Sequence, residues 1–162
     1  MVLASTSTGG GLTGTWSRPV LVNPPTDKAA FTAAIAVDQK GRVGVTYYDL
    51  TPPLISPDVL LTDTWFTATS GPGLDFGQRT LVGGPYNMLA APIARGYFVG
   101  DYMGIVPGAP ETRDSGSRSG GFVPIFVMTN CRDTSCTAQG TLDGSPAGPD
   151  STDVFASVAS SG

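Results

Sequence analysis

The sequence of 162 residues has the length of one ordinary domain and contains 22 glycines and 14 prolines, but only 14% charged residues. Its net charge is −4 and its nine basic residues are scattered, so nucleic acid is excluded as an expected partner. No apolar run approaches the roughly 20 residues that would span a membrane as a helix. Because glycine and proline favour turns, and 40% hydrophobic residues are too many for a disordered chain, the composition predicts an all-β protein.

The first predicted strand covers residues 16–22, and Pro19 within it indicates an edge strand or the start of a strand. The clearest element is a hairpin with strands at 31–37 and 42–48. Apolar and other residues alternate with a period of two in its second strand, and a short turn ending in Gly41 joins the two strands. Further strands are predicted at residues 59–61 and 64–68, 76–82, 96–106 and 122–128, with a turn over 70–75.

Two segments 60 residues apart have the same order of residue types. Residues 15–22 and 75–82 each have an aromatic residue first (Trp16 and Phe76), a basic residue within three positions, and Leu-Val at the end. Each is followed by a strand, a loop and another strand. A repeat of about 40–60 residues with four short strands is typical of a β-propeller blade. Chance similarity between short β segments is the alternative.

Three segments carry a resemblance to a known family. Residues 31–49, FTAAIAVDQKGRVGVTYYD, resemble the inner hairpin of sialidase-like propellers with BNR (Asp-box) repeats. Residues 98–105, FVGDYMGI, are similar to the Gly-Asp-Tyr-x-Gly strand of the same proteins. The segment SGPGLDF at 70–76 resembles their Asp-box turn, but it is one residue short and Pro72 stands where the aspartate belongs.

The resemblance implies about two four-stranded antiparallel blades over residues 1–130. Residues 131–162 are expected to form a separate segment, with a loop between two cysteines followed by a low-complexity C-terminal stretch. Because a propeller closes with roughly four to eight blades, the chain is expected to be an incomplete propeller. Its neighbours would be further blades from the same parent chain or from identical copies.

Five residues are the ligand-binding candidates. Asp101 and Tyr102 lead, because the family places their strand near the central channel, although a structural hydrogen bond between blades is the alternative. Tyr48 and Asp49 end a strand; core packing is the alternative for the tyrosine and capping of a turn for the aspartate. Arg95 could contribute to an anion site or simply be solvated.

No catalytic residue is assigned. The family uses an arginine triad, a Tyr–Glu pair and an aspartate, whereas this sequence has one glutamate, Glu111, in a polar loop. Cys131 and Cys136 are expected to form a short-loop disulfide, with a reduced buried pair as the alternative; a disulfide would imply a secreted protein. Without histidine or a third cysteine a zinc site is not expected, and neither another metal nor a cofactor is expected.

Two functions from different classes remain open. The chain is either part of a secreted sialidase-like protein that binds or hydrolyses glycosides, with carbohydrate as its ligand and an incomplete catalytic set, or a non-catalytic structural module. Such a module would assemble into an extracellular particle or filament. The lone glutamate and the degenerate Asp-box favour the second function for this segment alone, so whether it takes part in catalysis stays open.

Overall fold

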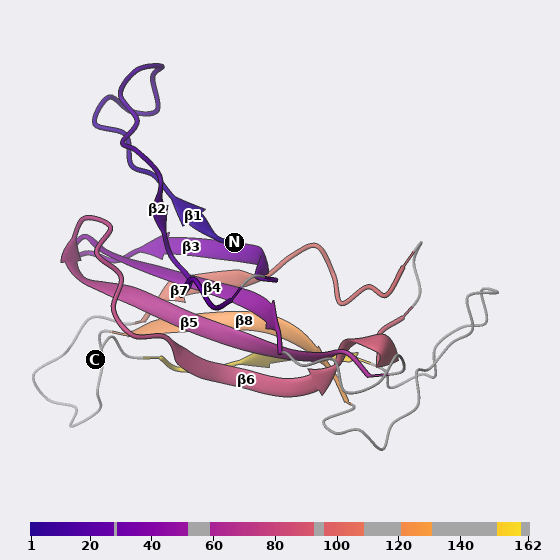
Figure 1. Ribbon diagram of the computed structural model, residues 1–162. Helices are drawn as coiled ribbons and strands as arrows, with labels where there is room; N and C mark the ends of the chain where they lie inside the picture. The colour runs from indigo at the N-terminus through magenta and orange to yellow at the C-terminus, as the bar shows by residue number, and fades with distance from the viewer. Residues whose placement is uncertain (28, 52–58, 93–95, 109–120, 131–151, 160–162) are drawn as a thin grey trace, which may run out of the picture.

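The computed structural model describes residues 1–27, 29–51, 59–92, 96–108, 121–130 and 152–159. These residues form nine β-strands in three antiparallel sheets and a single 3-10 turn (Figure 1). The prediction of an all-β protein is therefore confirmed, and none of the three sheets closes on itself. No helix within the described ranges is long and apolar enough to cross a membrane.

The first sheet is a small hairpin, residues 1–22, whose loop projects away from the other sheets (Figure 1). Its strands are β1 (Leu3–Ala4) and β2 (Val20–Leu21), and an isolated bridge joins Ser7 to Trp16 beyond them. The predicted strand over 16–22 is thus only two residues long. Pro19 stands immediately before it and has no N–H to add to the ladder.

The central sheet contains four strands in the order of the sequence. They are β3 (Phe31–Val37), β4 (Arg42–Leu50), β5 (Leu61–Pro72) and β6 (Thr80–Asn87). The predicted hairpin of β3 and β4 is confirmed. Its turn is held by the Asp38 carboxylate, which accepts from the backbone N–H groups of Lys40 and Arg42, both at 2.9 Å, and pairs with the Arg42 guanidinium. Gly41 supplies the positive φ that the turn requires.

The prediction for the next two strands was wrong in its boundaries. β5 is a single strand of twelve residues that runs through Ser70 to Pro72, where a turn was predicted, and β6 begins at Thr80 rather than at Phe76. The Thr69 hydroxyl helps β5 to continue, because it accepts from the Val43 N–H at 2.9 Å and donates to a backbone carbonyl two residues further on.

The third sheet packs behind the central one and contains β7 (Gly104–Pro107), β8 (Phe122–Thr129) and β9 (Thr152–Ala156), in that order (Figure 1). β8 agrees with its prediction. The strand predicted over 96–106 is wrong except at its end, because Gly96 and Gly100 have φ values outside the β region. Only an isolated bridge at Tyr97 precedes β7, which begins at Gly104. β9, from the predicted C-terminal segment, pairs with β8 from the predicted blade region.

The core lies on both faces of the central sheet. Side chains on β4 alternate, so Val43, Val45 and Tyr47 point to what we call the first face, and Thr46 and Tyr48 point to the second face. The first hairpin covers the first face with Val2, Ala4 and Val22. The third sheet covers the second face with Phe122, Phe126 and Met128. β4 is therefore buried along almost its whole length.

Two glycines of the central sheet allow the third sheet to come close. A Cβ atom on Gly44 of β4 would lie 2.7 Å from the ring of Phe122, and a Cβ on Gly83 of β6 would collide with the ring of Phe126. Both rings belong to β8 and are buried. The absence of a side chain at these positions thus creates the space for the aromatic core between the two sheets.

Candidate functional site

The leading candidates from the sequence, Asp101 and Tyr102, lie in an irregular segment before β7. Both are exposed, and 86% of the Tyr102 surface is accessible. Gly100, at a φ of 105°, turns the chain just before them. Their predicted placement on an inner strand between two glycines is therefore wrong, and no described side chain converges on them.

Tyr48 packs in the core, which was the alternative given for it from the sequence, and its hydroxyl has a further structural role. Its side chain is fully buried, and its hydroxyl donates to the Val127 carbonyl at 2.8 Å and accepts from the Val127 N–H at 2.9 Å. Pairing between β7 and β8 stops at Gly104 and Ile125, so Val127 lies beyond the end of β7. The hydroxyl takes the place of the missing strand partner and joins the central sheet to the third sheet.

Asp49 follows Tyr48 on β4 and points to the other face of the sheet, so these two candidates do not form one site. Asp49 is buried, and its Oδ1 atom has no hydrogen-bond partner among the described residues. Arg95, Glu111 and both cysteines lie outside the described residues. The candidates that are described are consequently not brought together.

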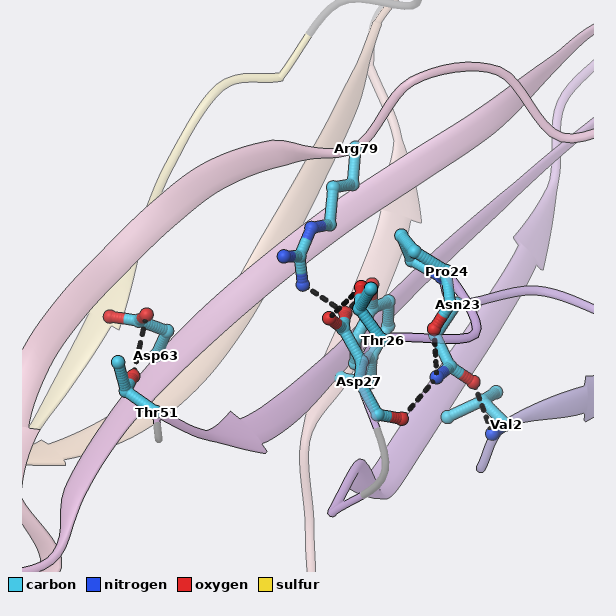
Figure 2. Close-up of polar contacts among 9 residues, drawn as sticks. Val2, Asn23, Pro24, Thr26, Asp27, Thr51, Asp63 and Arg79 are labelled. Atoms are coloured by element: carbon cyan, nitrogen blue, oxygen red, sulfur yellow. Dashed lines mark hydrogen bonds and ion pairs between the residues drawn. The ribbon is translucent and has the colours of Figure 1, made fainter. Parts of the chain in front are cut away.

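A group of polar side chains is centred on Asp27, in the loop between β2 and β3 (Figure 2). Its carboxylate forms an ion pair with Arg79, accepts a weak hydrogen bond from the Tyr47 hydroxyl at 3.4 Å, and accepts one from the Thr26 hydroxyl at 3.3 Å. The Arg79 guanidinium also lies over the Trp65 ring, with its central carbon 3.7 Å from the ring centroid. We call Asp27, Tyr47, Trp65 and Arg79 the Asp27 cluster.

Two strands and two loops position these four side chains. Tyr47 and Trp65 are direct partners in the pairing of β4 with β5, and Arg79 immediately precedes β6. The side chain of Arg79 reaches the carboxylate of Asp27 (Figure 2). Its guanidinium also lies over the indole ring of Trp65 and is therefore held by both groups. A guanidinium engaged in this way is already neutralised, which makes it a poor receptor for another anion.

The same loop is tied to the first hairpin through Asn23. The Asn23 Oδ1 atom accepts from the Val2 N–H at 2.6 Å, and its Nδ2 atom donates to the carbonyls of Asp27 at 2.7 Å and Pro24 at 3.2 Å. Asn23 is buried, so these bonds are shielded from water. Residues 23–27 therefore link the first hairpin to the Asp27 cluster and through it to the central sheet.

Burial dominates the electrostatics next to the cluster. Burial first, and then the negative charge of Asp27, raise the pKa of Asp49, Arg79 and the Ala29 N–H oppose the shift, and the resulting pKa is about 6. Burial also raises the pKa of Tyr47 well above its ordinary value. Tyr47 is therefore a neutral donor to Asp27, and Asp49 carries a proton in mildly acidic solution.

The hydrogen bonds and the ion pair of the Asp27 cluster link parts of the fold, and this is the role that the arrangement supports. Over the described ranges no three acidic or cysteine side chains are placed to hold a metal ion. An open groove of about 460 Å³ runs between residues 21–25 and residues 76–79, and it separates the first hairpin from the β5–β6 turn.

Sequence reasoning missed the Asp27 cluster because Asp27 and Arg79 lie 52 positions apart. The available signal was Arg79 itself, a charged residue within the matched segment.

Comparison with known proteins gives no relative. No family model matches the sequence, and no curated protein or solved structure matches it.

Proposed function

We propose that this chain is a non-catalytic scaffold segment of a sialidase-like β-propeller. It contributes the last two strands of one blade (β1–β2), a complete second blade (β3–β6) and the first three strands of a third (β7–β9). Its function in this proposal is to stack β-sheets into a larger, secreted assembly. The observation that carries the proposal is the matching pairing of two hairpins, the first hairpin (residues 1–22) and the second hairpin formed by β5 and β6.

The two hairpins pair in the same way. In the first, Ala4 faces Val20 and Ser7 bridges to Trp16. In the second, Phe66 faces Thr80 and Thr69 bridges to Phe76. The paired positions in the leading strand are three residues apart in both, and those in the returning strand are four apart. Only the loop differs in length, by two residues. Such agreement between separate segments is what successive repeats produce.

The third sheet supports the same proposal. Its order β7-β8-β9 repeats the order β3-β4-β5 of the central sheet, with antiparallel neighbours throughout. The central sheet is covered on one face by the first hairpin and on the other by the third sheet. Each repeat then buries its apolar surface against its neighbours, as repeat architectures require.

The roles of the polar side chains favour a scaffold over an enzyme. Tyr48 joins two sheets, and Arg79 is engaged by Asp27 and Trp65, so these residues serve the stacking. Glycoside binding or hydrolysis, which the resemblance implies for a parent protein, would depend on groups beyond the described residues. Carbohydrate is accordingly proposed as a ligand of the complete assembly and not of this segment.

A hydrolysis assay separates the two functions. The 162-residue chain is incubated with a fluorogenic sialoside, and variants Tyr102→Phe and Asp101→Asn serve as matched controls because both side chains are exposed. The scaffold proposal expects no turnover above buffer from any of the three proteins. Turnover by the wild type that either variant abolishes would overturn it, because the activity would then reside in this segment.

A further inference from the structure

The first face of the central sheet is only partly covered. Ile35 and Val37 of β3 lie opposite Val45 and Val43 of β4 on this face. The two β4 side chains are buried under the first hairpin, but Ile35 and Val37 are each 58% exposed. An apolar surface thus continues from a covered strand onto an uncovered one.

The third sheet has a second apolar surface on the side facing away from the central sheet. Alternation along β8 turns Phe122 and Phe126 inward and Val123 and Ile125 outward. The paired positions on the neighbouring strands extend this outward face: Val106 lies opposite Val123, Ala156 opposite Ile125, and Val154 opposite the outward-facing Val127. None of these six residues carries a charge, and 72% of the Val154 surface is exposed.

The structure already contains one contact of the kind that would cover both surfaces. On the second face, Ala36 of β3 packs in one cluster with Phe122 of β8, and Ile105 of β7 packs against the same cluster. An apolar face of β3 is therefore covered by the β7–β8 pair of the sheet that follows it. Among the described strands, none supplies the corresponding pair on the exposed face of β3, and none covers the outward face of the third sheet as β3 covers its inward face.

We propose that the outward face of the third sheet in one copy of this chain docks onto Ile35 and Val37 of a second copy. The contact continues the stacking seen within one chain, and it rests on the proposed function because it treats the sheets as successive repeats. Neither surface brings a charge that would be buried without a partner. Because two different surfaces meet, the contact is head-to-tail and generates a ring or an open filament.

The test uses two variants of the full chain in light scattering over a range of concentrations. Ile125→Lys places a charge on the outward face, and Ile35→Glu places one on β3. Ile125 is 38% exposed and Ile35 58%, so we expect both variants to fold. Leu12→Lys, in the first hairpin loop, is the matched control. The proposal expects the wild type and the control to self-associate, and each of the two variants to associate at least about 100-fold more weakly.

Mixing the two variants gives the sharpest result. Each retains one intact surface, so the mixture is expected to form a heterodimer that cannot grow further. A wild-type chain that is monomeric throughout, variants that assemble like the wild type, or a mixture that stays monomeric would each overturn the docking. A nuclear Overhauser contact between Gly44 and Phe122, measured on each variant, reports the stacking within one chain separately, so failure of the docking is distinguished from failure of the proposed function.

Discussion

The two hairpins have the same pairing but different surroundings. In the second hairpin, Trp65 and Phe76 pack against the first-face core and Phe66 is buried on the other side. In the first, Trp16 keeps 56% of its surface exposed, and its indole Nε1–H donates to the Gly11 carbonyl at 3.3 Å. Strand register is thus a local property of each segment, whereas burial depends on the sheets that lie on either side.

Arg79 shows that the pairing of a charged residue, like burial, depends on the sheets around it. When the two hairpins are aligned by their pairing, the first hairpin has Pro19 where the second has Arg79, and Arg18 is equivalent to Gln78. The basic residues that seemed to match in the sequence are therefore not equivalent. Only Arg79 finds a carboxylate and an indole, because only the second hairpin lies inside the stack.

The largest difference between the hairpins in the effect of a substitution on the free energy of unfolding is expected at Phe66. Its equivalent in the first hairpin is Ala4. Phe66 is buried, with its ring centroid 5.7 Å from that of Phe122. Phe66→Ala should lower the free energy of unfolding by about 3–5 kcal/mol, because the cavity opens between two sheets. Urea unfolding measures this loss, with the exposed Trp16→Ala as control at less than about 1 kcal/mol. Equal losses of free energy of unfolding for Phe66→Ala and Trp16→Ala would show that the two hairpins do not differ in burial.

A smaller effect is expected from Arg79→Ala. The change leaves the buried carboxylate of Asp27 without its ion pair and removes the contact with Trp65. We expect a loss of about 2–3 kcal/mol in the free energy of unfolding. Pro19→Ala, at the equivalent position of the first hairpin, is the matched control, with an expected change below about 0.5 kcal/mol. A loss for Arg79→Ala no larger than that of its control would show that the Asp27 cluster stabilises nothing.

The smallest expected effect depends on pH. Because the pKa of Asp49 is raised to about 6, the folded state binds its proton more tightly than the unfolded chain does. Wild-type stability should therefore fall as the pH rises from about 4 to about 6, and the cost of the buried charge is complete above that window. Asp49→Asn should be more stable than the wild type by about 1–2 kcal/mol at pH 7 and equal to it near pH 4.

Thermal unfolding at several pH values measures this difference. Asp38→Asn is a useful contrast, because hydrogen bonds from Arg42 and Lys40 outweigh burial and lower the pKa of Asp38. That variant should be less stable than the wild type at neutral pH. A constant difference between Asp49→Asn and the wild type across the whole range would contradict the assignment of the proton to Asp49.

The strands with the simplest patterns could be predicted from the sequence. Strict alternation identified β4, and a nearly continuous apolar run identified β8, which is covered on its inner face. The boundaries of β5 could not be predicted, because Ser70, Gly71 and Pro72 favour a turn. The strand continues through them because Pro72 pairs with Arg42 of β4 and the Thr69 hydroxyl accepts from the Val43 N–H. Local propensity was overruled there by pairing.

The candidate residues could be predicted far less well. Tyr48 and Asp49 were selected because they end a strand, but their roles follow from the sheets on opposite faces of β4, which no local pattern reveals. Asp101 and Tyr102 were placed on a strand by resemblance, and the glycine before them turns the chain out of the sheet. Asp27 and Arg79 meet only because two loops close on the same end of the central sheet.

The central claim is that the central sheet is stacked between the first hairpin and the third sheet. Nuclear magnetic resonance tests it directly through the α-protons of Gly44, which face the ring of Phe122. The account predicts strong nuclear Overhauser contacts between these α-protons and the Phe122 ring, with α-proton resonances shifted by the ring current. Random-coil shifts for Gly44 and no contact with Phe122 in the folded protein would contradict it.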